Sequence, residues 1–255
     1  MKHQVALVVL LTALLPELTF SQSSTPREEV TQSVEWFSLA SNIKVSKRVT
    51  LVAEGQFRFA QNFEPMQFQF RTAADIHITK KLSVVPFGYV YTWNPVYGKQ
   101  PNKFVNNEHR FWEQVMFKHH TGRFNFSHRA RLEQRYIQVH TISNGEVVYE
   151  GFDYYANRIR YRLMFNIPFG KKEMGPKTWF GSFYNETFLS WGPKVTYNKP
   201  DQNRVFVGVG YQGAKNLTVT GGLLNQMLVK ANGTKQENNY GVQVMVGYNF
   251  DLTER

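Results

Sequence analysis

The strongest constraint in this sequence is an alternation of apolar and polar residues that runs from position 50 to the end of the chain. Near the end, for example, Tyr240 and Val242 alternate with Gly241 and Gln243. A period of two is the repeat of a β-strand, because successive side chains point to opposite faces. No segment of this region has the repeat of an amphipathic helix. The pattern therefore predicts an all-β protein.

Eleven segments have this alternation or a weaker form of it. Most are near the roughly 9 to 11 residues that a tilted strand needs to cross a bilayer, and aromatic residues are frequent on their apolar faces. This predicts an antiparallel up-and-down transmembrane β-barrel of about 10–12 strands. The segments are 34–45, 51–59, 66–78, 82–93, 105–118, 124–136, 158–165, 177–191, 203–212, 216–229 and 239–250.

The connections between the segments alternate in length. In outer-membrane barrels short turns face the periplasm and long loops face the outside. Single-chain bacterial barrels also normally have an even number of strands, with both chain ends in the periplasm. We therefore expect ten strands if 34–45 is not part of the wall, or twelve if 24–33 contains another strand. The short turns are near 46–48, 80–81, 120–122, 170–175 and 213–215, and the longer connections are 61–65, 94–104, 139–152, 192–202 and 230–238.

The first 21 residues have the features of a cleaved signal peptide. Lys2 precedes an apolar run, and small residues precede a cleavage point before Gln22. The apolar run is too short for a transmembrane helix. We expect residues 22–33 to form an N-terminal segment and residues 34–255 to form the barrel. The sequence contains no cysteine, so no disulfide stabilises the exported chain, and barrel closure has to do so.

A soluble alternative is a secreted β-sandwich or jelly roll, in which one face of each strand packs on a core. That fold also produces alternation. It does not favour strands of full bilayer length with a consistently aromatic apolar face. The membrane barrel is therefore the preferred prediction, and the export signal places it in the bacterial outer membrane.

Charged strand faces carry a resemblance to a known family. The matching stretches are Asn107-Glu108-His109-Arg110 with Trp112, Arg129 to Arg135, Arg158 to Arg162, Asn185-Glu186, Gln202-Asn203-Arg204 and Gly208 to Tyr211. In combination they resemble a Bacteroidetes-type outer-membrane family known as domain of unknown function 2490. The resemblance covers roughly Val34 to Phe250. It implies a barrel in the outer membrane and supplies neither a reaction nor a ligand.

If the apolar faces meet lipid, the charged faces point into the lumen. Ten arginines then face five acidic residues, an excess of about five positive charges. We expect a largely filled lumen in which Arg and Glu pair across strands, so the role is structural. The alternative is a narrow anion-preferring channel, because unmatched Arg suits carboxylates and phosphates. The candidate lumen cluster is Glu108, Arg110, Arg129, Arg131, Glu133, Arg135, Arg158, Arg160, Arg162, Glu186 and Arg204, and Glu54, Arg58, Arg71, Asp75 and His77 also point inward.

Residues for catalysis are poorly placed in this sequence. Ser127 and His128 are adjacent and therefore lie on opposite faces of a strand. Asp75 and His77 share a face, with Ser83 across the turn, and this trio is the basis of an alternative hypothesis, an outer-membrane lipid-modifying hydrolase. We expect a non-enzymatic protein with no metal or cofactor.

The expected partners are those of an outer-membrane protein. Outer-membrane lipid and lipopolysaccharide would surround it, and the barrel-assembly machinery would insert it. No nucleic-acid motif is present, and the arginines follow strand interiors rather than one exposed face. The sequence leaves the oligomeric state open. Lysines in the long loops suited to lipopolysaccharide phosphates are Lys103, Lys194, Lys199, Lys230 and Lys235.

Overall fold

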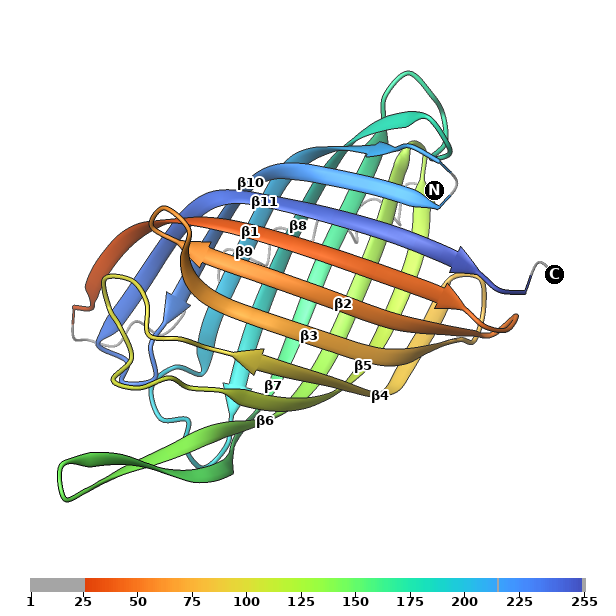
Figure 1. Cartoon of the computed structure of the whole chain (residues 1–255). Helices are drawn as coiled ribbons and strands as arrows, with labels where there is room; N and C mark the ends of the chain where they lie inside the picture. Colours follow the sequence, from red (N-terminus) through yellow and green to blue (C-terminus); the bar gives the residue numbers. More distant parts are fainter. Residues whose placement is uncertain (1–25, 215, 254–255) are drawn as a thin grey trace, which may run out of the picture.

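Eleven strands close into one barrel in the computed structural model, which describes residues 26–214 and 216–253 (Figure 1). The expected signal peptide, 1–21, lies outside the described residues. None of the described residues forms a helix of the length and apolarity needed to cross a membrane. In chain order the strands are β1 (Glu28–Lys44), β2 (Val49–Ala60), β3 (Glu64–His77), β4 (Leu82–Trp93), β5 (Glu108–Thr121), β6 (Phe124–Ser143), β7 (Glu146–Pro168), β8 (Thr178–Trp191), β9 (Pro200–Gln212), β10 (Leu217–Val229) and β11 (Lys235–Asp251).

The barrel is closed by a parallel pairing of β1 with β11, in which Val34 lies opposite Gly241 and Ser41 opposite Tyr248. All other neighbouring strands pair antiparallel and follow one another in sequence. The expectation of an even strand number was therefore wrong. Segment 34–45 belongs to the wall, and residues 28–33 extend the same strand instead of forming an additional one. Successive strands alternate in direction. An odd number of them therefore closes into a barrel only if the first and last strands run in the same direction.

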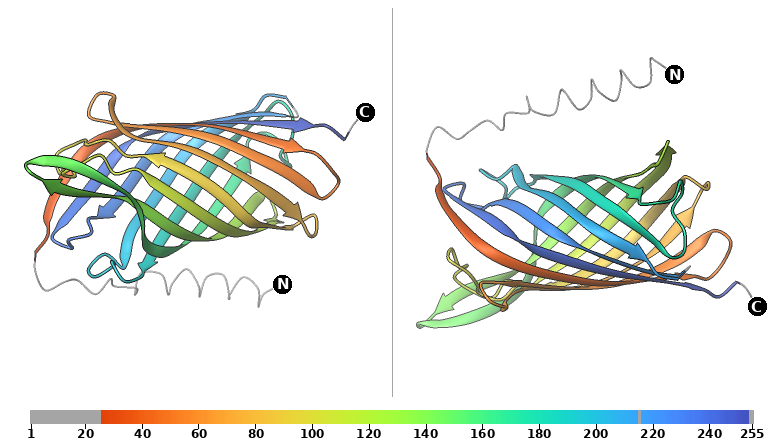
Figure 2. Two further views of the ribbon diagram at one scale, coloured as in Figure 1. Left: turned by 60° about the horizontal axis from the view of Figure 1, so that its bottom comes forward. Right: turned by 90° about the horizontal axis from the view of Figure 1, so that it is seen from above.

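The connections divide the barrel into two ends. The short-turn end carries the connections 45–48, 78–81, 122–123 and 169–177 and the one that follows Gln212. The long-loop end carries 61–63, 94–107, 144–145, 192–199 and 230–234. Because β1 and β11 are parallel, β1 starts at the long-loop end and β11 finishes at the short-turn end (Figure 2). This differs from the expectation that both chain ends share one side.

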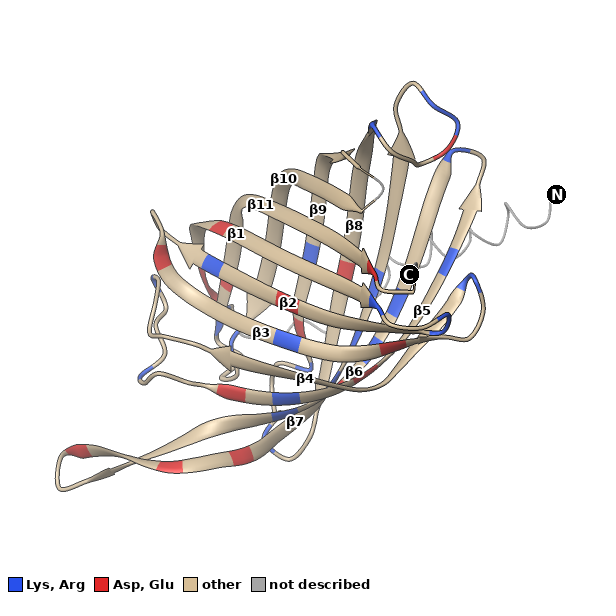
Figure 3. Ribbon diagram, turned by 45° about the vertical axis from the view of Figure 1, so that its right-hand side comes forward, with Lys and Arg blue, Asp and Glu red and all other residues tan. Residues whose placement is uncertain are grey.

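The hairpin of β6 and β7 projects beyond the long-loop end, as Figure 3 shows. We predicted residues 139–152 to be a polar loop, and this was wrong, because most of them extend the two strands. The turn is Asn144-Gly145, with φ angles of 52° and 84°. Positive φ at both positions is the geometry of a tight two-residue hairpin turn, and Asn-Gly is the preferred dipeptide for it.

The alternation separates two surfaces of the sheet. Large apolar side chains are exposed on the outside of the barrel, and every one of the eleven strands contributes at least one. Charged and amide side chains point inward and are mostly buried. Because the fold is one closed sheet, the two-sheet sandwich alternative was wrong. Exposed outward residues, one from each strand, are Leu39, Phe57, Phe70, Phe87, Val115, Phe124, Ile159, Trp179, Val207, Leu223 and Val242.

Aromatic side chains fill much of the interior. Trp112, Phe180, Phe188 and Phe206 are almost completely buried inside the barrel. Trp112 lies against the backbone of Gly88 on the neighbouring strand, where a β-carbon would collide with the indole ring. A glycine at that inward position therefore makes room for the indole ring of Trp112.

Candidate functional site in the barrel lumen

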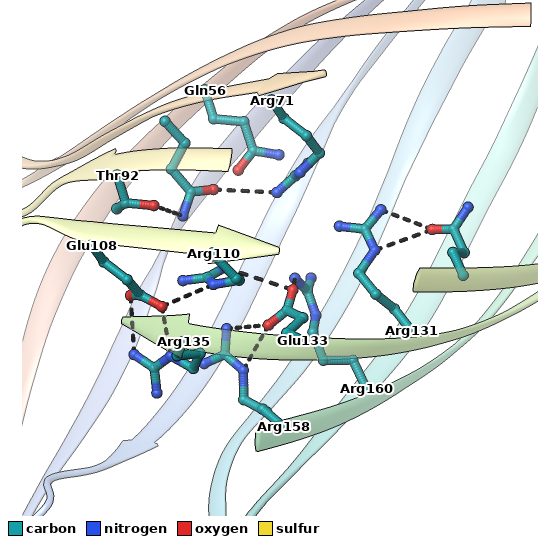
Figure 4. A network of polar contacts seen from close by, with 12 residues as sticks. Gln56, Arg71, Thr92, Glu108, Arg110, Arg131, Glu133, Arg135, Arg158 and Arg160 are labelled. Carbon is teal, nitrogen blue, oxygen red and sulfur yellow. Dashed lines mark hydrogen bonds and ion pairs between the residues drawn. The ribbon is translucent and has the colours of Figure 1, made fainter. Parts of the chain in front are cut away.

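The centre of the lumen is the carboxylate of Glu133, which points inward from β6 and is fully buried. Arg158 donates from Nη2 to Oε2 at 2.6 Å, and Arg160 donates from Nη1 to Oε1 at 2.7 Å. Arg110 Nη1 lies 3.6 Å from the same Oε1. Figure 4 shows the three guanidinium groups converging on this one side chain. They come from β5 and β7, the strands that flank β6.

Glu108 forms a second centre nearer the long-loop end. Arg135 donates to both of its oxygens, from Nε at 2.7 Å and from Nη2 at 3.1 Å. Arg110 donates from Nε at 2.9 Å, so it joins Glu108 to Glu133 (Figure 4). Arg110 and Arg135 lie directly opposite each other in the β5–β6 register. Two facing cations are stable there because both bind one carboxylate.

Glu186 on β8 forms the third centre. Its Oε1 accepts from Arg129 at 2.5 Å and from Arg160 at 2.9 Å, and its Oε2 lies 3.6 Å from Arg204 Nη1. A fourth carboxylate, Asp201, lies 3.4 Å from Arg158 Nη1. We call the connected set the ion-pair network. Its members are Glu108, Arg110, Arg129, Glu133, Arg135, Arg158, Arg160, Glu186, Asp201 and Arg204.

Positive charge remains in excess in this part of the lumen. The ion-pair network contains six arginines and four carboxylates. Within the described residues, Arg58, Arg131 and Arg162 have no carboxylate within ion-pair distance. Arg58 donates to the amide oxygens of Gln67 and Gln56, and Arg131 donates to Gln114 at 2.8 Å and 3.1 Å. Neutral amides satisfy hydrogen bonds and leave the charge uncompensated.

Aromatic rings hold several of these guanidinium groups in place. The Trp36 ring has Arg58 Cζ 4.3 Å from its centroid and Arg204 Cζ 4.9 Å from it. Trp112 lies under Arg131 at 3.9 Å. Cation–π contacts of this kind are stronger where water is excluded. Trp36 thus links the unpaired Arg58 of β2 to the ion-pair network through Arg204 of β9.

The 94–107 loop crosses the long-loop end of the lumen. Its Tyr97 is buried against β11, and the Tyr97 hydroxyl donates to Glu237 at 3.3 Å. Lys99 in the same loop donates to the Thr31 carbonyl of β1 at 2.7 Å. Burial and the neighbouring Glu237 carboxylate raise the pKa of Tyr97 well above its ordinary value. The hydroxyl therefore keeps its proton and remains a donor.

Two cavities lie at opposite ends of the lumen and share no lining residue. The long-loop cavity has a volume of about 290 Å³ and is lined by Arg58 and by several members of the ion-pair network, including Arg204. The short-turn cavity, about 520 Å³, is lined by Lys80, Lys118 and Arg162 among others, with no carboxylate. The two cavities are separate regions of positive charge.

The residues considered for catalysis do not form a triad. Ser83 donates to Asp75 at 3.1 Å, but the His77 Nε2 hydrogen bond is with Thr50 Oγ1, at 3.0 Å. His77 and Ser83 lie opposite each other in the β3–β4 register, but no side-chain hydrogen bond joins them among the described residues. The structure also contains, over its described ranges, no group of three or more His, Asp or Glu side chains that could hold a metal ion. The Asp-His-Ser chain of hydrogen bonds that activates a serine nucleophile is therefore not formed by these three residues.

The structure unites most of the residues that the sequence pattern selected. Nine of the eleven residues in the candidate cluster belong to the ion-pair network, and only Arg131 and Arg162 do not. Asp201 was not predicted as a site residue, because it falls in the connection expected at 192–202. Trp36, to which the alternation assigned no face, and Tyr97, which falls in the connection expected at 94–104, were not predicted either.

Of the five lysines expected in long loops, Lys235 is instead the first residue of β11, so that expectation was wrong for it. Three of the five have carboxylate partners. Lys194 pairs with Asp153, Lys230 lies 2.5 Å from Glu237, and Lys235 lies 3.7 Å from Glu28. Lys103 contacts the Phe104 ring at 5.1 Å. These pairs join the long loops to the β7 hairpin and to the β1–β11 seam. They are part of the structure of the long-loop end.

The fold and lumen define a class of protein, a closed β-barrel with an apolar outer surface and an ion-paired interior. The model of the family described as "Protein of unknown function (DUF2490)" matches residues 35–238, and the chain belongs to this family. The expected family membership is therefore confirmed. The searches of curated proteins and of solved structures gave no match to the chain.

Proposed function

We propose that this protein is an integral outer-membrane β-barrel with a closed lumen and no catalytic role. The observation that carries the proposal is the apolar outer surface, to which all eleven strands contribute exposed large side chains. Leu223, for example, is 65 % exposed and Phe70 is 59 % exposed. Monomeric soluble proteins rarely expose a continuous apolar surface of that extent.

The polarity of the barrel is the reverse of that of a soluble barrel. Soluble barrels bury apolar residues inside and expose polar ones, whereas here Arg58, Glu133 and Glu186 are inside and buried. A polar interior and an apolar exterior suit a barrel whose outer solvent is lipid. The strands have 12 to 23 residues, enough for tilted strands to span a bilayer.

Two pairs of polar side chains on the outer face contact each other on that face. Gln134 Nε2 donates to Glu113 at 3.0 Å, and Asn185 Nδ2 donates to the Asn203 Oδ1 atom at 3.2 Å. In lipid an unsatisfied polar group is costly, so internal pairing lowers the free energy of insertion. These pairs are compatible with the proposed surroundings.

The filled interior supports a closed lumen rather than an open pore. Trp112, Phe206 and Glu133 have almost no exposed surface, and they lie between the regions lined by the two separate cavities. In this proposal the long-loop end faces outward, where Lys103 and Lys199 are available to lipopolysaccharide phosphates. The barrel-assembly machinery would insert the exported chain, and an anion-conducting pore is the competing function.

The test is to refold residues 22–255 into lipid vesicles and to compare unheated and boiled samples on a denaturing gel. A heat-dependent mobility shift, together with retention in the vesicles after alkaline carbonate extraction, is the expected result. A soluble, monodisperse protein that needs no detergent would contradict the membrane proposal. Planar-bilayer recordings of the folded sample should show no steady conductance, and steady anion-selective steps would favour the pore.

A further inference from the structure

We propose that the long-loop cavity is a binding site for a small oxyanion, either a phosphate or the carboxylate of a polar solute. The cavity has a volume of about 290 Å³ and is lined by Arg58, Arg158, Arg160 and Arg204. This proposal adds a class of ligand to the proposed function. It rests on that function in one respect, which is the side of the membrane from which the ligand enters.

The side chains around the cavity carry an excess of positive charge. The ion-pair network has two more arginines than carboxylates, and Arg58 adds a third uncompensated charge beside it. Burying unpaired charge is costly in a protein interior. An anion from solution offsets this cost, and the cavity is the place beside Arg58 and Arg204 where it would fit.

Buried polar atoms without partners lie on the cavity wall. Arg204 Nε is a donor that makes no hydrogen bond to the described residues, so it can bind an oxyanion. Asp201 Oδ1 and Asn198 Oδ1 are acceptors without partners there, and they suit the hydroxyl groups of a ligand. All three residues are more than nine-tenths buried and line the cavity. Arg204 has one ion-pair contact, at 3.6 Å to Glu186, so most of its donor capacity remains for a ligand.

Arg58 and Arg204 are held in position before a ligand arrives. Trp36 lies within 4.3 Å of Arg58 Cζ and 4.9 Å of Arg204 Cζ. Arg58 also donates to Gln56 and Gln67. Planar guanidinium groups fixed in this way bind oxyanions with little loss of side-chain entropy.

The wall of the cavity also defines the size and polarity of the ligand. Neutral amides of Gln67, Asn94, Gln202 and Gln226 line the cavity together with the arginines. Such amides suit the hydroxyl groups of a polar solute, and a volume near 300 Å³ is at the lower limit of small-molecule sites. Loop residues such as Tyr97 and Asn198 line it as well, so the ligand would enter from the long-loop end.

The experiment is calorimetric titration of the refolded barrel with inorganic phosphate and, separately, with glucuronate, at constant ionic strength maintained with sodium chloride. Arg58→Gln should weaken binding by about tenfold, because it removes one charge-assisted contact and leaves no carboxylate unpaired. Asp201→Asn should strengthen binding, because it removes a negative charge from the wall. Arg162→Gln is the matched control, since it removes the same charge at the opposite cavity.

The proposal would be overturned by the absence of saturable heat with both anions, or by equal weakening in Arg58→Gln and Arg162→Gln. Equal weakening would mean general attraction by net charge. Each variant is first checked for the heat-dependent gel shift, so failure to bind in a folded barrel counts against the site and leaves the membrane proposal intact. A stronger response to phosphate than to glucuronate would identify the oxyanion as phosphate.

Discussion

Tyr97 and Glu237 are 140 positions apart in the sequence, and the Tyr97 hydroxyl donates a hydrogen bond to the Glu237 carboxylate at 3.3 Å. This contact fixes the 94–107 loop, which starts from β4, against β11 on another part of the barrel wall. The long-loop end is therefore covered by a segment whose position depends on a buried side-chain contact.

Replacing Tyr97 with Phe should make the 94–107 loop detach from β11 more often. A net hydrogen bond contributes about 0.5 to 1.5 kcal/mol, so trypsin should cleave at Lys99 and Lys103 roughly 2- to 12-fold faster. The matched control is Tyr197→Phe, because Tyr197 is a loop tyrosine that is 66 % exposed. The rate of cleavage followed by mass spectrometry measures the effect. Equal rates in the two variants would mean that the Tyr97 hydroxyl does not hold the loop.

Replacing Glu133 with Gln should destabilise the barrel strongly. Arg158 and Arg160 would lose their shared carboxylate while remaining buried. Removing one partner of a buried ion pair costs about 3 to 5 kcal/mol. Urea unfolding in vesicles measures the change in the free energy of unfolding. The control is Glu173→Gln, because Glu173 is exposed in the connection 169–177 at the short-turn end. This substitution should leave the free energy of unfolding unchanged. A similarly small change for Glu133→Gln would show that the ion pairs are not needed for stability.

Replacing Gly88 with Ala should also destabilise the barrel, for a steric reason. The added β-carbon would collide with the Trp112 ring, and overpacking of a filled interior costs about 1 to 3 kcal/mol. Gly221→Ala is the control, because a β-carbon at Gly221 meets nothing within 4 Å. The double variant Gly88→Ala with Trp112→Leu should lose less stability than the sum of the single variants. Strict additivity would argue against direct contact.

The parallel closure of the barrel can be tested with a disulfide, because the chain has no cysteine of its own. Ser38 and Met245 lie opposite each other in the β1–β11 register. Neighbouring strands are roughly 4.8 Å apart, which suits a disulfide between Ser38→Cys and Met245→Cys. Non-reducing gels of boiled samples should show the crosslink. Cysteines at Ser38 and Asn249, four residues further along β11, should not crosslink, and the reverse pattern would contradict the register.

The fold could be predicted from the sequence because every strand repeats the same pattern of one apolar face and one polar face. An amphipathic sheet follows from this alternation. The length of the strands and the aromatic residues on their apolar faces then favour a closed barrel over a sandwich. The number of strands and their direction at the closure do not follow from the alternation. The parallel register of Val34 with Gly241 depends on which strands meet, and this is a property of the whole barrel.

The projecting hairpin shows a local signal that the sequence analysis did not use. Asn144-Gly145 favours a tight turn, and it lies between runs rich in β-branched residues. The high polarity of 139–152 suggested a loop, whereas the segment pairs as strand outside the main wall. The candidate lumen cluster was predicted more completely than the hairpin, because the period of two determines which side chains point inward. The Asp201 contact with Arg158 was not predictable, since it joins β9 to a strand that is not its neighbour.

The most direct test of the central claim is spin-label accessibility of the outer surface in lipid vesicles. Labels would be placed at Leu39, Phe70, Val115, Val207 and Leu223, with Asn144 at the hairpin tip as the aqueous control. A membrane barrel predicts that the five outer sites are accessible to oxygen and protected from a water-soluble nickel reagent, with the opposite result at Asn144. Access of the nickel reagent to all six sites would contradict membrane insertion.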